Sequence, residues 1–261
     1  MHTLSLHNDF CVVVPVYNHA DTFANVVNDI RLHGFNVLVV NDGSTDSTHN
    51  RLEQLSQKIG NNQPHLHVLS YPKNRGKGYA LYQAFKCLSR LGYSHALTMD
   101  ADGQHLSKDI LLIIQDIHLF PNAICVGSRE AKHKNQPPKN RFANHFSNFW
   151  FFIQTGKYLP DTQSGFRLYP IKTICRMYFV SKRYEWELEV LVRLAWAGIP
   201  IITKPISVYY PPPQESLSHF RPGIDFLRIS ILNTLLCFGA LFYYYPLCFL
   251  RLFFRLFKKL M

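Results

Sequence analysis

The chain has 261 residues, of which 47% are hydrophobic and 17% charged; this composition argues against a disordered protein and fits one large α/β domain with a C-terminal appendage. The formal net charge of +11 points to nucleic acid, an anionic membrane surface or a phosphorylated substrate as partner. The cations gather in 73–77, 129–141 and 251–259. Because these are two loops beside polar motifs and an apolar tail, we favour membrane and phosphate and expect no nucleic-acid partner.

Apolar runs and helical spacings predict strands that alternate with helices along the first 210 residues. The predicted strands cover 10–14, 37–40, 65–70, 95–99, 123–127 and 200–209. The predicted helices cover 21–33, 47–59, 77–91, 108–119, 142–158 and 184–197. Ser47 or Asp46 is expected to cap the second helix. This alternation predicts a mostly parallel, doubly wound sheet, in which ligands bind at the carboxyl ends of the strands.

The six cysteines, at 11, 87, 125, 175, 237 and 248, form no CxxC pair and mostly lie in apolar runs. This pattern favours reduced, buried cysteines in a cytosolic compartment over a disulfide framework or a zinc site. The first thirty residues contain three aspartates and lack the apolar run of a signal peptide, so we expect no export.

The C-terminal segment 223–261 is predicted to associate with a membrane, beside a catalytic domain at 1–222. Residues 229–250 carry no formal charge, and Arg251 and Arg255 follow them. As one helix these 22 residues would cover about 33 Å, barely the thickness of a hydrocarbon core. We expect a hairpin-like pair of helices or a helix lying in the interface; a true span and a buried core helix are the alternatives.

Asp100 and Asp102 follow an apolar strand directly. Two carboxylates one residue apart in a loop can both turn toward one hard cation, and Gln104 adds a neutral oxygen two residues further on. The alternative is an ordinary solvated turn. The position after a strand of an α/β pattern favours the cation.

Two further polar loops lie at the ends of predicted strands or helices. Asn41-Asp42-Gly43-Ser44 ends a strand, and Asp42 could accept hydrogen bonds from a nucleobase or a ribose. The segment 74–78 combines two glycines with Arg75 and Lys77 before a helix, which suits phosphate or ribose. Neither a P-loop nor a dinucleotide fingerprint is present.

Together with Pro15-Val16-Tyr17-Asn18, these loops make the chain resemble the family 2 glycosyltransferases of GT-A fold. Within that family it looks most like the dolichol-phosphate mannosyltransferase and polyprenyl-phosphate glycosyltransferase group. The likeness covers about residues 9–210. It rests on the segments VVVPVYN at 12–18, VVNDGSTDST at 39–48, NRGKGYAL at 74–81, MDADGQH at 99–105, GSR at 127–129 and DTQSGFRLY at 161–169.

The resemblance implies the roles of the candidate residues. Donor binding would fall to Pro15, Tyr17, Asn18, Asp42, Lys77 and Asp100. A Mg²⁺ or Mn²⁺ ion would be held by Asp102 and Gln104 together with Asp100. The catalytic and acceptor-phosphate residues would be Arg129, Ser164 and Arg167, with Asp161 beside them. Guanidinium groups suit such a site because they pair bidentately with phosphate, although Arg167 and the Ser164 turn also fit purely structural roles.

The chain departs from the family pattern at three places. His19 stands where relatives often have Glu, and Asn41 stands where Asp is frequent. The family's downstream Arg and Gly-x-Ser-Lys segment is replaced by residues 211–221. His219 in that segment is a candidate contact of the diphosphate or the acceptor, or simply a loop histidine.

The resemblance implies an inverting displacement at the anomeric carbon of a nucleotide-diphosphate sugar. A lipid-phosphate acceptor needs no strong base, so Asp161 would position it; a hydroxyl acceptor would make Asp161 the candidate base. Transfer to a hydroxyl of a glycolipid or glycan is therefore the first alternative. A nucleotide-binding membrane scaffold without turnover is a more distant one. We expect the protein on the cytoplasmic face of a membrane; the oligomeric state stays open.

Overall fold

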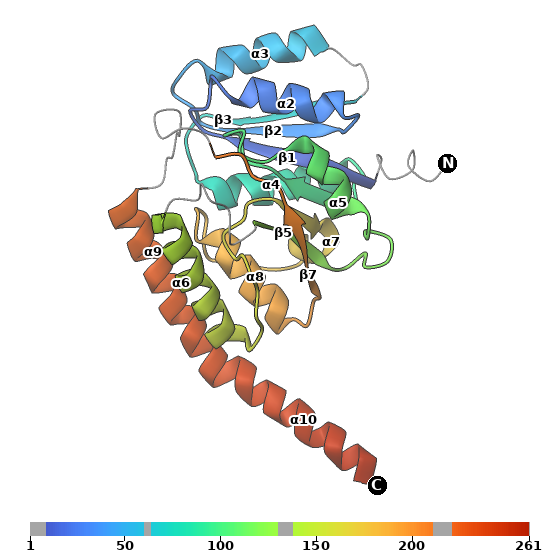
Figure 1. Cartoon of the computed structure of the whole chain (residues 1–261), viewed down its shortest axis with the longest axis vertical. Coiled ribbons are helices and arrows are strands. Elements are labelled where there is room, and N and C mark those ends of the chain that lie inside the picture. The colour runs from blue at the N-terminus through green and yellow to red at the C-terminus, as the bar shows by residue number, and fades with distance from the viewer. Residues whose placement is uncertain (1–8, 60–63, 130–137, 211–220, 261) are drawn as a thin grey trace.

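The computed structural model describes residues 9–59, 64–129, 138–210 and 221–260. The described residues form a seven-stranded sheet with the order β3-β2-β1-β4-β6-β5-β7 (Figure 1). The strands are β1 (Phe10–Val16), β2 (Val37–Asp42), β3 (Leu66–Tyr71), β4 (His95–Thr98), β5 (Ile124–Arg129), β6 (Arg167–Pro170) and β7 (Ile201–Ile206).

The sheet is mostly parallel, as expected. Strands β1 to β4 run in one direction, and β5 runs parallel to β7. Only β6 runs antiparallel, between β4 and β5. The carboxyl ends of β1, β2 and β4 therefore meet at one edge, where polar loops from distant parts of the sequence come together.

Helices cover both faces of the sheet (Figure 1). Alternate residues of β1 enter two cores because successive side chains of a strand point to opposite faces. Val12 and Val14 pack with α2 (Phe23–Leu32), α3 (Thr48–Ile59) and α5 (Ile110–Ile114). Cys11 and Val13 pack on the other face. That core contains α4 (Lys77–Arg90), α7 (Ile171–Cys175) and α8 (Trp186–Trp196).

Several local predictions can be compared with these elements. The side chain of Asp46 accepts the N–H of Thr48, the first residue of α3, over 2.9 Å. The predicted helix 108–119 was too long: a 3₁₀ turn (Ser107–Asp109) leads into α5, and after Ile114 the N–H groups of Ile117 and Leu119 bond three residues back. Such tight turns cannot continue an α-helix. Strand β6 and helix α7 were not predicted. The six cysteines are all described and form no disulfide.

The C-terminal segment is one continuous helical run, so the predicted hairpin-like pair of helices was wrong, whereas a helix lying in the interface stays a prediction. It consists of α9 (Pro222–Gly239), a π-helical segment (Ala240–Tyr244) and α10 (Tyr245–Leu260). Within it the helix 223–257 is long and apolar enough to cross a membrane. Figure 1 shows α9 beside α6 (Pro138–Thr155), whereas α10 extends away from the domain.

Candidate functional site

A cavity of about 710 Å³ opens at the carboxyl ends of β1, β2 and β4; we call it the main cavity. It brings together most of the residues that were predicted to bind a donor. Its lining consists of Pro15, Val16, Tyr17, Asn18, His19, Asp42, Asn74, Gly76, Lys77, Ala80, Asp100, Ala101, Asp102, Arg183, Tyr184, Arg221 and Asp225. The loops identified separately in the sequence are thus parts of one site.

The Asp42 carboxylate shapes one wall of the main cavity. It is buried, and its two oxygens accept the N–H groups of Arg75 and Gly76 over 2.9 and 2.7 Å. The loop after β2 therefore holds the loop before α4. Gly43 is required between them, since its φ is +69° and a Cβ there would lie 2.4 Å from the Asn74 nitrogen. Asp42 lines the cavity, but its carboxylate is engaged mainly in these hydrogen bonds to the backbone.

Asn18 makes a second link between loops. Its backbone adopts φ +53°, and its N–H donates to Ser44 Oγ over 3.0 Å. The side-chain carbonyl of Asn18 accepts the N–H of Thr45 over 2.8 Å. The loops after β1 and β2 are therefore joined beside the cavity. Asn tolerates the left-handed conformation better than most residues, which explains its place at the end of the Pro15–Asn18 segment.

Lys77 bridges two carboxylates beside the main cavity. Its Nζ lies 2.7 Å from Asp100 Oδ1 and 3.1 Å from Glu187 Oε2. Burial disfavours the charged ammonium, but the two carboxylates outweigh burial and raise the pKa of Lys77 above its usual value. Glu187 was missed by the sequence analysis. It lies in the first turn of α8, and the only signal was an acidic residue at the start of a helix whose other positions are largely apolar.

Asp100 and Asp102 carry different proton affinities. Burial raises the pKa of Asp100, but the Lys77 ammonium outweighs this and holds it below its usual value. Burial and the negative charge of Asp100 raise the pKa of Asp102 to about 6. The charge of Lys77 thus compensates that of Asp102 less than that of Asp100.

The two aspartates fit a divalent cation. Both line the same cavity, and a cation would relieve the repulsion that raises the pKa of Asp102. Within the described ranges no group of three or more His, Cys, Asp or Glu side chains is placed to hold a metal. Water and substrate phosphates would have to complete the coordination, as Mg²⁺ prefers.

Gln104 does not line the main cavity, contrary to its predicted role as a metal ligand. Its backbone N–H donates to Asp102 Oδ1 over 3.0 Å, and its carbonyl accepts the N–H of Tyr209 over 2.9 Å. The residue therefore orients the Asp102 carboxylate through its main chain.

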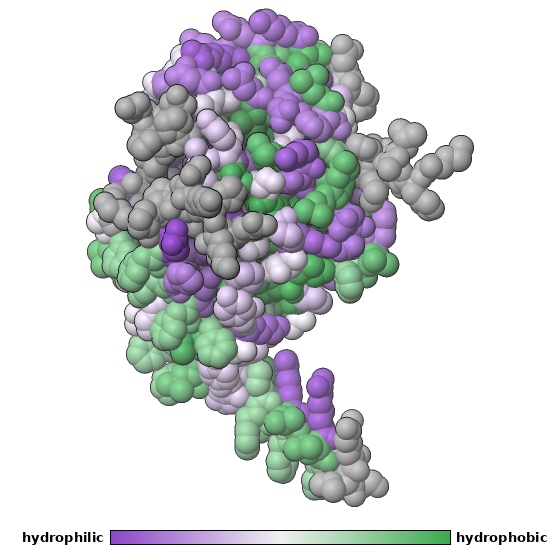
Figure 2. Space-filling model, viewed as in Figure 1, coloured by the Kyte–Doolittle hydropathy of each residue, from purple (hydrophilic) through white to green (hydrophobic). Residues whose placement is uncertain are grey.

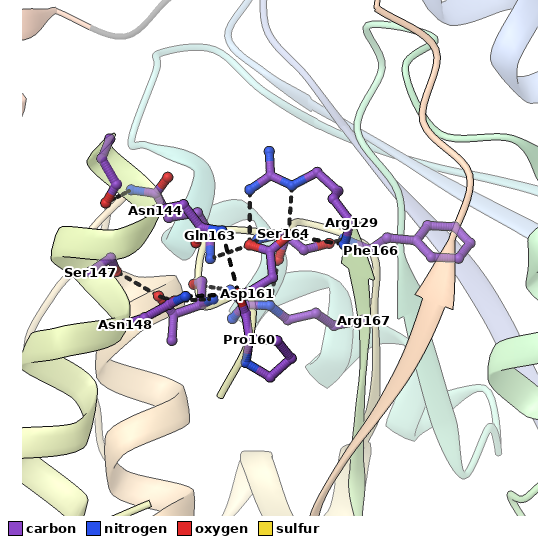
Figure 3. Close-up of polar contacts among 12 residues, drawn as sticks. Arg129, Asn144, Ser147, Asn148, Pro160, Asp161, Gln163, Ser164, Phe166 and Arg167 are labelled. Atoms are coloured by element: carbon purple, nitrogen blue, oxygen red, sulfur yellow. Dashed lines mark hydrogen bonds and ion pairs between the residues drawn. The ribbon is translucent and has the colours of Figure 1, made fainter. Parts of the chain in front are cut away.

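Arg129 and Asp161 form a two-pronged ion pair (Figure 3). Arg129 Nε lies 2.6 Å from Asp161 Oδ2, and Nη2 lies 2.9 Å from Oδ1. Asp161 is fully buried and also accepts the N–H groups of Gln163 and Ser164 over 3.1 Å each. Burial raises the pKa of Asp161, but these hydrogen bonds and the charge of Arg129 outweigh burial and lower it. Such a carboxylate suits positioning and is a poor proton acceptor.

Two residues expected at the acceptor phosphate are instead structural. Arg167 is 0% exposed, and its guanidinium donates to the carbonyls of Ser164, Thr162 and Glu187 over 2.6, 2.9 and 2.7 Å. It is therefore committed to holding the turn that carries Asp161 (Figure 3). The Ser164 hydroxyl is buried and accepts the N–H of Phe166 over 3.3 Å, which closes the same turn. The expectation that these two side chains face the acceptor was wrong, because both are buried and their polar atoms are engaged in hydrogen bonds to the main chain. His219 lies outside the described residues.

Gly165 joins the Asp161 turn to the main cavity. A Cβ at this position would lie 2.5 Å from Asp100 Oδ2 and 3.1 Å from Lys77 Nζ. Backbone and carboxylate can approach this closely only at glycine. The turn that begins at Asp161 is thereby packed against the Asp100 carboxylate, which lines the main cavity.

A second, smaller cavity of about 300 Å³ is lined by Arg129; we call it the basic cavity. Arg141 and His145 reach it from successive turns of α6, so two further cationic or titratable side chains join Arg129 there. The sequence analysis did not propose these two as site residues. The whole lining is Ser128, Arg129, Arg141, Asn144, His145, Asn148, Tyr158, Pro160, Thr203 and Pro205.

A third cavity of about 400 Å³ lies between α6 and α9; we call it the apolar groove. Its walls are mainly aromatic and aliphatic, with a few small polar groups from α9. It is lined by Phe146, Trp150, Ser230, Asn233, Thr234, Cys237, Phe238 and Leu241. Because α6 contributes residues to both cavities, the basic cavity and the apolar groove share one helix.

Comparison with known proteins identifies the family. The family model described as Glycosyl transferase family 2 matches residues 11–179. A UDP-N-acetylglucosamine–dolichyl-phosphate N-acetylglucosaminyltransferase of Methanococcus voltae is 31% identical over 214 residues, covering 76% of this chain and 85% of the relative. An undecaprenyl-phosphate mannosyltransferase of Micrococcus luteus is 25% identical, covering 75% of this chain and 81% of that protein.

Solved structures agree with this in fold. Glucosyl-3-phosphoglycerate synthase from Mycobacterium tuberculosis, solved with Mn²⁺ and UDP, gives a TM-score of 0.53 at 15% identity, covering 80% of this chain and 74% of that one. The mannosyltransferase PcManGT from Pyrobaculum calidifontis, solved with GDP-Man and Mn²⁺, gives 0.55 at 18% identity, covering 79% and 58%. The sheet and helices therefore form a GT-A fold, and the chain belongs to glycosyl transferase family 2.

Proposed function

We propose that this glycosyltransferase moves a sugar from a nucleoside-diphosphate donor to a polyprenyl-type lipid phosphate, with a divalent cation and inversion at the anomeric carbon. The observation that carries the proposal is a set of three cavities with different linings, of which the basic cavity contains Arg129. The main cavity holds paired carboxylates and Lys77, the basic cavity adds Arg141, and the apolar groove follows along α6. A sugar nucleotide, a phosphate and a hydrocarbon chain match these surfaces in turn.

The relatives support the same acceptor class. The Methanococcus voltae and Micrococcus luteus proteins are named for dolichyl phosphate and undecaprenyl phosphate. A dolichyl-phosphate β-glucosyltransferase of Dictyostelium discoideum is 28% identical over 211 residues, covering 73% of this chain and 63% of that protein. These relatives are named for different sugars. The proposal therefore names the acceptor class, a lipid phosphate, and the sugar has to be found by experiment.

The residues divide the chemistry between them. When bound, a Mg²⁺ or Mn²⁺ ion held by Asp100 and Asp102 neutralises the negative charge that develops on the leaving diphosphate. Lys77 supplies a further positive charge at the edge of the same cavity. The acceptor phosphate is already anionic at neutral pH, so it attacks without a strong base. Arg129 orients it, and Asp161 holds Arg129 in place.

The experiment compares acceptors as well as donors. The purified protein in detergent is incubated with UDP-sugars or GDP-mannose and either undecaprenyl phosphate or undecaprenol. Nucleoside diphosphate release and the labelled lipid product are measured with and without EDTA. We expect product with the lipid phosphate alone, lost in EDTA and restored by Mg²⁺ or Mn²⁺. Product with the alcohol would favour the hydroxyl acceptor, and donor binding without turnover would favour the silent scaffold.

A further inference from the structure

Beyond its first residue, Tyr245, helix α10 extends away from the catalytic domain (Figure 1). Seven of its large apolar side chains are more than half exposed: Phe249, Leu250, Leu252, Phe253, Phe254, Leu256 and Phe257. A soluble protein rarely presents so many large apolar groups on one unpartnered helix. We therefore expect a binding partner to cover the apolar side chains of α10.

The preceding part of the helix is attached firmly to the domain. Leu232, Leu236 and Ala240 are buried, and Gln154 of α6 donates to Asn233 Oδ1 over 2.9 Å. At the end of this region the Tyr245 hydroxyl donates to the carbonyl of Ile153 over 2.7 Å. The helix is therefore held along α6 as far as Tyr245.

Close packing at Gly239 adds to this attachment. A Cβ at Gly239 would lie 2.7 Å from the Trp196 ring. Trp196 also donates its indole N–H to the carbonyl of Gln154 over 2.7 Å and stacks on Tyr244. Because α8 carries Trp196, α9 and the π-helical segment are fixed to the sheet domain itself.

This attachment argues against a transmembrane helix. One side of the charge-free segment packs on the domain as far as Tyr245, so this part could enter a bilayer only by drawing α6 and α8 with it. The part that is free to leave is α10, whose 16 residues measure about 24 Å, short of the roughly 30 Å of a hydrocarbon core. Arg251 and Arg255 would also lie within that span, where charges are costly.

The residue pattern of α10 fits the plane of a membrane instead. Arg251 and Arg255 are four residues apart and share one side of the helix. Phe249, Phe253 and Leu256 share the opposite side, at spacings of four and three. A helix with a basic side and a broad apolar side lies at the boundary between headgroups and acyl chains.

We propose that α10 is an in-plane anchor that binds anionic phospholipid, with Arg251 and Arg255 at the headgroups and the Phe and Leu side chains in the acyl region. Exposed apolar side chains of the neighbouring helices extend this surface: Phe142, Phe146, Phe149, Phe152, Ile231, Leu235, Phe238 and Phe242. Figure 2 shows hydrophobic residues gathered at the lower left of the domain, where α6 and α9 lie, and on α10. The anchor would hold the apolar groove at the membrane, and this role rests on the proposed lipid acceptor.

Flotation of the full-length protein with vesicles tests the anchor, without donor or acceptor present. We compare phosphatidylcholine vesicles with vesicles that also contain phosphatidylglycerol. The test variant is Arg251→Glu/Arg255→Glu. The matched control, Arg90→Glu/Lys172→Glu, reverses two exposed charges on the catalytic domain. Phe253→Ser tests the apolar side separately. Melting temperature and binding of UDP and GDP show that each variant is folded.

We expect the vesicle partition coefficient of the test variant to fall about tenfold or more on anionic vesicles, since anionic headgroups attract basic residues and repel acidic ones. The control should bind like the wild type, Phe253→Ser should bind more weakly, and salt should weaken wild-type binding. Equal binding to neutral vesicles, or resistance to an alkaline carbonate wash, would overturn the proposal in favour of a span. Self-association through α10 would also overturn it. Vesicle binding with no lipid product would instead count against the proposed function alone.

Discussion

Asp161 grips the guanidinium of Arg129 with both carboxylate oxygens, at 2.6 and 2.9 Å, while its own backbone turn donates two N–H groups back to it. The carboxylate is fully buried and the arginine is 17% exposed. The pair therefore fixes the direction of one cation that reaches the basic cavity. Because both carboxylate oxygens already accept hydrogen bonds, we propose that Asp161 positions Arg129 and does not abstract a proton.

The first prediction concerns stability. Asp161→Asn keeps the side-chain shape but leaves the Arg129 charge without its partner, so the free energy of unfolding should fall by about 3 kcal/mol. Guanidinium unfolding followed by tryptophan fluorescence measures the change. Asp116→Asn is the control, because its ion pair with Lys204 is more exposed and should contribute about 1 kcal/mol or less. Equal losses in both variants would contradict the structural role of the buried pair.

The second prediction concerns acid. Folding lowers the pKa of Asp161, so its ionised form stabilises the folded state above the pKa of the unfolded chain, about 3.9. This contribution is lost as pH falls through the lower, folded pKa. The stability difference between wild type and Asp161→Asn should therefore be constant from about pH 7 to 5 and shrink below about pH 4. Unfolding curves of both proteins across this range measure it. A difference that is constant down to pH 3 would contradict the lowered pKa.

The third prediction concerns the cation. Asp102→Asn removes one of two carboxylates, so Mn²⁺ binding in the presence of a nucleoside diphosphate should weaken and sugar transfer should fall about 100-fold or more. Electron paramagnetic resonance of free Mn²⁺ measures the affinity independently of turnover. Asp21→Asn, which removes a carboxylate that is 78% exposed, is the control and should change neither quantity. Unchanged Mn²⁺ affinity in Asp102→Asn would remove Asp102 from the proposed cation site.

The sequence predicted the main cavity well because its parts follow parallel strands. Asp42 ends β2 and Asp100 follows β4, and these two strands lie on either side of β1. Lys77 begins the helix between β3 and β4, so the topology brings all three residues to one edge of the sheet. Each was identifiable from a short polar segment after an apolar run. Alternation of strand and helix also gave the right sheet class, with β6 as the exception.

Other side chains near the cavities could not be placed in this way. Arg167 begins the antiparallel strand β6 opposite Thr98, and its guanidinium is buried because it donates to main-chain carbonyls of Ser164 and Glu187. Glu187 meets Lys77 across 110 residues of sequence, through packing of α8 on α4, and no local pattern encodes that contact. Arg141 and His145 reach the basic cavity only because α6 lies over it.

The fourth prediction concerns Gly165, where the Asp161 turn meets the main cavity. Gly165→Ala places a methyl group about 2.5 Å from Asp100 Oδ2, so Asp100 and Lys77 must shift. We expect the KM for the donor to rise about tenfold or more with a smaller effect on folding, because a misplaced contact weakens both ground and transition state. Gly223→Ala, where nothing lies within 4 Å of the added atom, is the matched control. If both variants have the same donor affinity, the Asp100 side chain can move away from the added methyl group without weakening donor binding.

The fifth prediction separates acceptor from donor. Arg141 lines the basic cavity with Arg129 and does not line the main cavity. If it binds the acceptor phosphate, Arg141→Ala loses a charge-assisted hydrogen bond of about 1.5–3 kcal/mol, which raises the KM for lipid phosphate about 10- to 100-fold. The KM for the donor should stay unchanged, because the main cavity is intact. Arg176→Ala, a cation of the catalytic domain that lines none of the three cavities, controls for net charge. A rise in the donor KM instead would mean that the basic cavity receives the leaving diphosphate, and the order of the three cavities along the reaction path would have to be reversed.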